Sequence, residues 1–398
     1  MGSMNTDRTL HPISTAELAR RWGAVRLQMQ ARHLDALVVQ ASQDWLGGYL
    51  KWFTDEPATN GYPCTAIFPA DGAMTVVEQG PMNGRRSVRS DDPANRGIGL
   101  YRYTPSYSAI HYTKHYDAAL VAEELQAAGH TRVGLIATAQ MQYDFVHHLR
   151  ETLPAVHFSD ATDWVDDIKA IKSPEEQAGI RAAAALQDQV IAAVARWVTP
   201  GRRDFEIAAY AQYVAQGLGS EQGIFLGCSA PLGQPAVFRP RHQKGRELRA
   251  GEHFSLLVEV NGPGGLYTEI ARTFVLGKAP QELVDGLETV KAAQQFMLAQ
   301  MRPGAQPRDI HAAFNDYMKT RGLPEETRLN AHGMGYDMVE RPLIRHDETM
   351  PIAAGMNIVV HPGFVNERMF AVVCDNYLIG EQGPPASLHR TPQQIIEL

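Results

Sequence analysis

The chain has 398 residues, of which 44% are hydrophobic and 20% charged, as in a globular protein too long for one ordinary core. A formal net charge of -7 argues against a nucleic-acid-binding surface. The opening Met-Gly-Ser-Met resembles a remnant of an expression vector, and neither a signal peptide nor an apolar run of membrane-spanning length follows. We therefore expect a cytoplasmic protein that binds neither membrane nor nucleic acid. Three widely spaced cysteines predict reduced thiols.

Residues 5–165 alternate between helix and strand patterns. Ser14 and Glu17 form a capping box that predicts a helix to about Arg32, and a short buried strand follows at 36–39. Strand patterns at 65–68 and 74–78 flank an Asp-Gly turn and predict a hairpin, while a helix over 117–128 leads into a strand at 132–136. This alternation predicts a mostly parallel or mixed sheet covered by helices. No glycine-rich phosphate loop follows a strand, so nucleotide binding is not expected.

A second domain, residues 166–398, begins near a strong helix start at Ser173-Pro-Glu-Glu176. Its helices are expected at about 174–198, 204–216, 281–301 and 308–321, and its strands at about 254–260, 269–276, 357–360 and 370–379.

Four segments of this second domain place metal-ligating or proton-transferring side chains on or beside strands. They are Arg239-Pro-Arg-His242, Glu259–Thr273, Ala331–Gly335, and His361-Pro-Gly363 followed by Cys374-Asp375. A buried reaction centre needs side chains of these types brought together from several elements, so the pattern indicates an enzyme.

Taken in order, these segments resemble the creatinase and aminopeptidase P family, the M24-type pita-bread proteins. Residues 168–176 (IKAIKSPEE) resemble the family's interdomain signature, 267–273 (YTEIART) its Tyr-x-Ser-Asp-x-Thr-Arg-Thr segment, 332–335 its His-Gly-Ile-Gly, and 361–363 its Glu-Pro-Gly. The resemblance covers nearly the whole chain. It implies an α/β (α+β) fold with an N-terminal creatinase-like α/β domain at 5–165 and a C-terminal pita-bread catalytic domain at 166–398.

Metal-dependent members of this family hold two divalent ions with two Asp, one His and two Glu, and only the His is unchanged here. The matching positions are Glu259, Glu269, His332, His361 and Cys374, of which Glu259 requires a one-residue shift. Four carboxylates become two, so the formal charge falls from about -4 to about -2 or -3, enough for one dication but not for two. We expect no dimetal centre. Either one Zn or Fe ion binds here, or none does and these are hydrogen-bonded interior histidines beside a buried cysteine.

Creatinase is the family's metal-free hydrolase, and His242 matches the position of its catalytic histidine. We expect His242 to act as general base and acid, because a neutral imidazole can take a proton and return it to a leaving nitrogen. Glu269 and His332 would orient the imidazole or the water, and Tyr267 would donate to a developing oxyanion. Creatinase binds the guanidinium group of its substrate with two Glu residues. The matching positions here are Ala271 and His361, so the substrate must differ.

Cationic side chains near the expected cleft predict a small anionic substrate, because a guanidinium group can form two parallel hydrogen bonds to a carboxylate. The alternative is that these side chains form a solvated cationic surface. The expected substrate-binding residues are Arg239, Arg241, Arg341, Arg345 and His361, with Trp52 and Tyr62 as pocket walls. The resemblance also implies a homodimer in which the N-terminal domain lends residues to the partner's site.

These observations favour a creatinase-like hydrolase that cleaves an amide-type C–N bond of a small, carboxylated, non-peptide substrate with His242 as base. Three alternatives stay open. They are a one-metal lyase or hydrolase resembling the dimethylsulfoniopropionate lyase of this fold, an Xaa-Pro-type metallopeptidase, and a non-catalytic binding protein.

Overall fold

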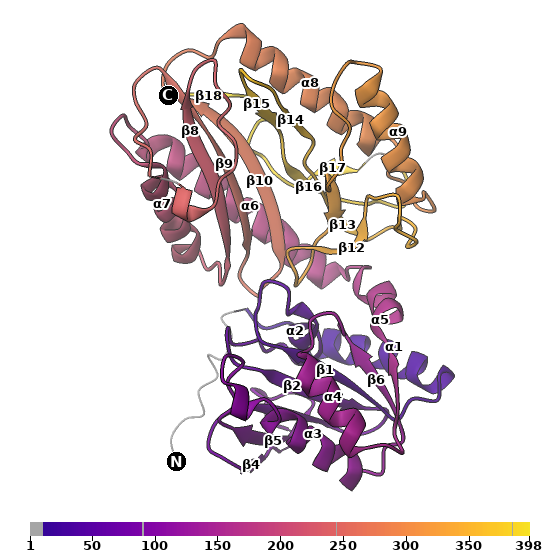
Figure 1. The fold of residues 1–398 in the computed structure, drawn as a ribbon. Coiled ribbons are helices and arrows are strands. Elements are labelled where there is room, and N and C mark those ends of the chain that lie inside the picture. The colour runs from indigo at the N-terminus through magenta and orange to yellow at the C-terminus, as the bar shows by residue number, and fades with distance from the viewer. Residues whose placement is uncertain (1–10, 90, 244, 384) are drawn as a thin grey trace. The chain divides into compact units, whose positions relative to one another are not determined.

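The computed structural model describes residues 11–89, 91–243, 245–383 and 385–398, so residues 5–10 of the expected N-terminal domain lie outside it. The chain divides into two compact units, one that ends at Lys169 and one that begins at Ala170 (Figure 1). The boundary expected between 165 and 166 falls inside α5 (Thr162–Lys169), a helix of the N-terminal unit. Among the described residues, no helix combines the length and the apolar character needed to cross a membrane.

The N-terminal unit is a seven-stranded mixed sheet with helices, as expected from its alternating patterns. The strand order is β4-β5-β3-β2-β1-β6-β7. The strands are β1 (Ala36–Ala41), β2 (Cys64–Pro69), β3 (Met74–Gln79), β4 (Gly84–Ser87), β5 (Ile98–Thr104), β6 (Arg132–Ile136) and β7 (His157–Asp160). The helices are α1 (Thr15–Ala31), α2 (Gly48–Thr54), α3 (Tyr116–Ala127), α4 (Tyr143–Thr152) and α5, with a short 3-10 turn η1 (His111–Thr113). The predicted hairpin is confirmed, because β2 and β3 pair antiparallel.

The described part of the C-terminal unit contains two larger sheets, each covered by a pair of helices, and one two-stranded sheet (Figure 1). The first sheet has the order β18-β10-β9-β8 and packs against α6 (Pro174–Trp197) and α7 (Asp204–Gly217). The second has the order β12-β11-β13-β16-β17 and packs against α8 (Gln281–Leu298) and α9 (Pro307–Lys319). The strands of the first sheet are β8 (Gly223–Pro231), β9 (Glu252–Asn261), β10 (Tyr267–Val275) and β18 (Ile396–Glu397). Those of the second are β11 (Ala331–Gly333), β12 (Glu340–Leu343), β13 (Asn357–Val360), β16 (Asp375–Leu378) and β17 (Ala386–Ser387), and a separate hairpin joins β14 (Gly363–Val365) to β15 (Phe370–Val372).

Alternation along these strands decides which side chains face the helices and which face the opposite, inner side. In β9 and β10, Val258 and Ile270 belong to the core cluster beneath α6 and α7, while Leu257 and Ala271 belong to a second cluster on the other face. In β13, Ile358 and Val360 pack toward α8 and α9, and Val359 joins that same inner cluster. The inner faces of the two sheets are therefore where the ligand-capable side chains gather.

The strand expected over residues 370–379 is wrong as one continuous element. It is divided into β15 and β16, with Val373 and Cys374 between them. Cys374 belongs to neither strand and instead forms an isolated β-bridge to Ala271 of β10. This break joins the second sheet to the first at the site described below.

Candidate active site

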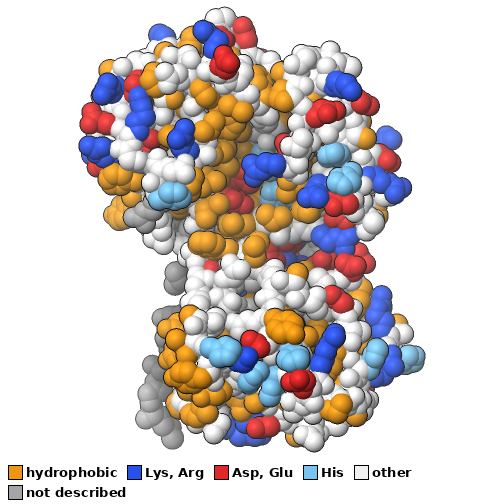
Figure 2. All heavy atoms as spheres, viewed as in Figure 1, with side chains coloured by type: hydrophobic (Ala, Val, Ile, Leu, Met, Phe, Trp, Pro, Cys, Tyr) orange, Lys and Arg blue, Asp and Glu red, His pale blue; other side chains and the backbone are white. Residues whose placement is uncertain are grey.

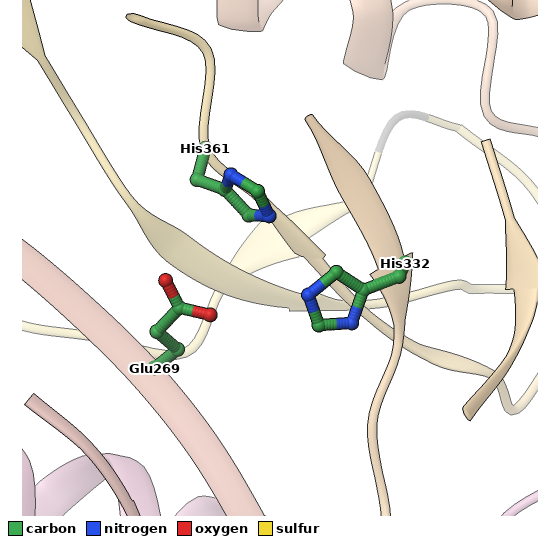
Figure 3. A group of neighbouring side chains, drawn as sticks. All are labelled: Glu269, His332 and His361. Carbon is green, nitrogen blue, oxygen red and sulfur yellow. The ribbon is translucent and has the colours of Figure 1, made fainter. Parts of the chain in front are cut away.

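Three side chains from three different strand regions converge on the inner face of the C-terminal unit. Glu269 of β10, His332 of β11 and His361 after β13 each offer one ligand atom, and these atoms lie within 4.8 Å of one another. Figure 3 shows the two rings and the carboxylate directed toward a common centre. The rings are 5.3 Å apart and inclined at 68°, so they do not stack, and each leaves a nitrogen for a shared ligand.

The hydrogen bonds of the two histidines suit a metal ion. His332 donates from Nδ1 to the carbonyl of Gly333 at 2.9 Å, which fixes the ring and leaves Nε2 as the lone-pair nitrogen. His361 Nε2 is buried and has no hydrogen-bond partner among the described residues. Burial lowers the pKa of His332 to about 4 and that of His361 to about 3, the latter also through the charges of His332 and Arg328. Both imidazoles are therefore neutral near pH 7, the form that binds metals.

Two buried carboxyls stand side by side at the edge of this cluster. Glu259 and Glu269 are directly paired across β9 and β10, so their side chains share one face. Val258, the residue that would match without the one-residue shift, belongs instead to the core cluster beneath α6 and α7. Burial raises the pKa of Glu269 to about 7, and burial with the nearby Glu269 charge raises that of Glu259 well above its usual range. A cation placed beside these two carboxyls would lower both pKa values and favour the carboxylate forms.

Cys374 completes the set of five aligned positions. Its thiol donates to Glu269 Oε1 at 3.2 Å, and burial with the carboxyls around it raises its pKa well above the usual value. Without a cation in contact, Cys374 is therefore a neutral thiol, whereas an ion that coordinated it would bind the thiolate. The cluster can thus offer a bound ion two carboxylates and at most one thiolate.

Several polar residues to which the sequence analysis assigned no role hold this arrangement in place. Asn376 accepts the Glu269 backbone N–H at 2.6 Å and donates to Asn357 at 3.0 Å. Arg272 is buried beside Asp375, with which it forms an ion pair at 2.6 Å, and it donates to the Cys374 carbonyl at 3.1 Å. Polar residues at alternate positions of buried strands were the available signal, because a buried polar group needs a partner.

The other expected catalytic residues lie on different parts of the same unit. Tyr267 is fully buried on the Glu269 face of β10. His242 is exposed in η2 (Arg241–Gln243), and its ring lies 3.3 Å from the amide of Gln243. The structure does not place His242 within the three-ligand group. Its role, like that of Tyr267, stays a prediction.

Two of the four expected substrate-binding arginines form ion pairs with acidic neighbours. Arg341 pairs with the buried Glu348 at 2.5 Å, and Arg345 pairs with the exposed Asp347 at 2.9 Å. Arg239 is exposed, and the side chain of Arg241 lies outside the described part of the chain. Figure 2 shows a hollow on one face of this unit, floored by hydrophobic side chains, with acidic and histidine atoms at its base and Lys or Arg at its rim.

The two aromatic residues expected as pocket walls belong to the N-terminal unit. Trp52 is only 1% exposed and packs edge to face on Phe53, so within this unit it is a core residue. Tyr62 is exposed and makes an edge contact with Tyr107, which leaves its ring accessible. Contact with a substrate stays a prediction for both.

Comparison with known proteins gives this geometry a family context. The chain is 27% identical over 243 residues to a probable dipeptidase, PepE, of Mycobacterium tuberculosis, covering 59% of this chain and 63% of that protein, which is less than two thirds of its length. It is 26% identical over 263 residues to an Xaa-Pro dipeptidase of Pyrococcus furiosus, covering 64% of this chain and 73% of that protein. The crystal structure of dipeptidase PepE from Mycobacterium ulcerans superposes with a TM-score of 0.74 at 21% identity, covering 97% of this chain and 99% of that one, a likeness that shows the fold.

Two family profiles match successive parts of the chain. The creatinase/prolidase N-terminal domain matches residues 21–171, and metallopeptidase family M24 matches residues 178–381. These matches confirm the family resemblance and the two-part α/β fold expected from the sequence. The chain belongs to metallopeptidase family M24.

Proposed function

We propose that this protein hydrolyses an amide bond of a short peptide or peptide-like molecule with one divalent metal ion bound by Glu269, His332 and His361. The observation that carries the proposal is the convergence of these three ligand atoms within 4.8 Å. Two His and one Glu form the ligand set of well-known single-zinc peptidases. The unpartnered Nε2 of His361 and the fixed tautomer of His332 fit that role. A bound ion would act as a Lewis acid toward the amide carbonyl.

Charge favours one ion over two. Family sites with two ions are neutralised by four carboxylates, whereas this cluster offers Glu259 and Glu269. A second dication would face Cys374, which can supply at most one negative charge, and a neutral His361 in place of two carboxylates. We therefore assign a single zinc or iron ion.

The relatives support a peptide bond over the non-peptide C–N bond favoured from sequence alone. Those relatives are named dipeptidase and Xaa-Pro dipeptidase, so we propose a small substrate of that type, carrying a carboxylate. In this scheme Glu269 and the two histidines hold the ion, and Tyr267 and His242 stay as proposed donor and proton carrier. A homodimer is part of the proposal, by analogy with the family.

Elemental analysis of the purified protein tests the assignment directly. We expect about one zinc or iron per chain, loss of hydrolysis on chelation, and recovery when the ion is returned. His361→Ala and Glu269→Gln should each lower the metal content, while the exposed His157→Ala, a matched control in the other unit, should not. A metal content near two, or hydrolysis that persists in the metal-free protein, would contradict the proposal. Mass analysis of products formed in ¹⁸O-water separates hydrolysis from elimination, because only hydrolysis incorporates the oxygen.

A further inference from the structure

The N-terminal unit contains a cavity of about 370 Å³ that is lined by α4 and by the ends of β6 and β7. The strands β6 and β7 are parallel, so their carboxyl ends lie at one edge of the sheet. Ligands of α/β proteins commonly bind just outside the carboxyl ends of such strands. The volume is within the range of small-molecule sites, about 300 to 1,000 Å³. No residue that lines this cavity belongs to the candidate active site.

Part of the wall of this cavity is apolar. Leu135 and Met141 are buried, and Val146 is half-buried. Along α4, Tyr143, Val146 and Arg150 occupy positions i, i+3 and i+7, so one face of the helix borders the cavity. The Tyr143 ring is exposed and therefore lies at the rim. An aliphatic group of a ligand can pack on Leu135, Met141 and Val146.

A fixed carboxylate lines the same cavity. Asp160 accepts the Thr162 N–H at 2.8 Å and its hydroxyl at 2.6 Å, both on Oδ1, and the Thr138 hydroxyl at 2.6 Å on Oδ2. Burial acts to raise the pKa of Asp160, but the hydrogen bonds from Thr138 and Thr162 prevail and lower it. The group is therefore ionised near pH 7, and Oδ2 keeps a lone pair for a cationic ligand.

The backbone at the end of β6 adopts an unfavourable conformation beside this carboxylate. Ala137 has a φ of 57°, in the left-handed region that residues with a Cβ rarely adopt. Its N–H donates to Thr162 Oγ1 at 2.9 Å, and the next residue, Thr138, reaches Asp160. Backbone strain of this kind concentrates at binding and catalytic sites, where it positions a functional group.

A guanidinium lines the cavity without a partner. Arg150 is exposed, and its side chain makes no hydrogen bond or ion pair with the part of the chain that the structure describes. It is therefore available to an anion, and a guanidinium can form two parallel hydrogen bonds with a carboxylate. The cavity thus combines a negative group, a positive group and an apolar surface.

We propose that this cavity binds a free amino acid with an aliphatic side chain, such as leucine. Asp160 pairs with the ammonium group, Arg150 pairs with the carboxylate, and the aliphatic side chain packs on the apolar wall. Asp160 disfavours a ligand that is only anionic, and Arg150 one that is only cationic, so the charges favour a zwitterion. The proposed metal ligands belong to the other unit, and this inference does not depend on the proposed hydrolysis.

Ligand-observed NMR titration of the full-length protein with leucine and three analogues tests the site. We expect leucine to bind with a Kd of about 1 mM or tighter. The analogues are 4-methylpentanoate, which lacks the ammonium group, leucinamide, which lacks the carboxylate, and glycine, which lacks the aliphatic side chain. Each should bind about tenfold more weakly than leucine or worse. Absence of leucine binding at about 10 mM, or equal binding of all four compounds, would overturn the proposal.

Variants assign each charge of the ligand to its partner. Arg150→Ala should weaken leucine and 4-methylpentanoate by about tenfold or more and leave leucinamide unchanged. Asp160→Asn should instead weaken leucine and leucinamide and leave 4-methylpentanoate unchanged. The matched control is Arg181→Ala, an exposed arginine of α6. Because Arg150 is exposed, its variant should fold even if Asp160→Asn, which alters hydrogen bonds to Thr162, does not. Unchanged leucine binding in Arg150→Ala would exclude this cavity.

The candidate active site is the other place where an amino acid could bind. His361→Ala should lower the metal content and leave the affinity for leucine unchanged. Loss of leucine binding in His361→Ala, with retention in Arg150→Ala, would assign leucine to the metal site and overturn this proposal. Leucine binding is measured without a peptide substrate, so the result is independent of whether the protein hydrolyses peptides.

Discussion

Asp117 is a buried carboxyl in the first turn of α3, and its surroundings favour the neutral acid. One of its oxygens has no hydrogen-bond partner among the described residues. Burial raises its pKa to about 6, against a hydrogen bond with Ser106 that acts in the opposite direction. In the unfolded chain the same carboxyl titrates at its ordinary value of 3.8.

This difference predicts how the pH affects stability at one residue. Below about pH 4 the carboxyl is protonated in both states, and between about pH 4 and 6 the folded state binds more protons, so stability falls as the pH rises. Above about pH 6 the full cost, about 3 kcal/mol at most, is present. Asp117→Asn removes the cost of ionising this buried carboxyl, but it also removes a negative charge that is favourable at a helix N-terminus. We therefore expect the free energy of unfolding to rise by about 1–2 kcal/mol at pH 7.5. Denaturant unfolding should show no gain near pH 4; a gain independent of pH would exclude this origin.

His242 gives a residue-scale prediction about the chemistry. If it carries the proton in turnover, His242→Ala should lower kcat by about 10²- to 10⁴-fold. Because the side chain is exposed, the unfolding midpoint should not move. A variant with near wild-type kcat would show that the proton moves by another route. The control is His157→Ala, an exposed histidine of the other unit.

At the scale of elements, a buried ion pair explains a glycine of the His-Gly-Met-Gly segment. Lys172, just before α6, pairs with Glu340 of β12 at 2.6 Å, and both side chains are almost fully buried. A Cβ at Gly335 would lie 2.4 to 2.6 Å from the Glu340 carboxylate and Lys172 Nζ. The turn after His332 therefore packs directly on the pair, and a larger residue at position 335 would require the ends of these two side chains to shift.

Removing one partner of this pair should be more harmful than removing both. Lys172→Met leaves the Glu340 carboxylate buried without its cation, and we expect a loss of about 3–5 kcal/mol in the free energy of unfolding. The double variant Lys172→Met with Glu340→Met leaves no unpaired charge and should recover much of that loss. Denaturant unfolding of both single variants and the double variant forms the cycle. If the two single losses simply add, the pair is not coupled.

Local signals in the sequence were enough for many helices and some strands, but not for elements that depend on distant contacts. Ser173 and Glu176 form the predicted capping box, and α6 begins where expected. Strand β8, which contains Gly223 and Gly227, was not among the predicted strands. Gly227 is needed there because a Cβ would lie 2.4 Å from the Ser255 carbonyl of β9.

The residues of the candidate site also differ in whether local sequence signals were enough to predict them. Aligned motifs were sufficient to identify Glu269, His332 and His361, since each lies in a recognisable segment. The pairing of Glu259 with Glu269 depends on the β9–β10 register, which only the fold determines.

At the scale of the whole molecule, the chain contains two units with separate hydrophobic cores. One cluster lies among β1, β6, α3 and α4 of the N-terminal unit, and others lie beneath the helix pairs of the C-terminal unit. The three proposed metal ligands all belong to the C-terminal unit. Metal binding should therefore stabilise one unit directly and the other only as far as the two unfold together.

This separation predicts the response of thermal unfolding to the metal. With zinc at about one hundred times its Kd, binding adds about 2.7 kcal/mol, which for a unit of this size raises the unfolding midpoint by about 5–10 °C. In differential scanning calorimetry, chelation should lower one transition by that amount and leave the other in place. Leu125→Ala, in the core of the N-terminal unit, should lower the metal-insensitive transition instead, through a loss of about 2–5 kcal/mol. Chelation and Leu125→Ala acting on the same transition would mean that the two units unfold as one cooperative body.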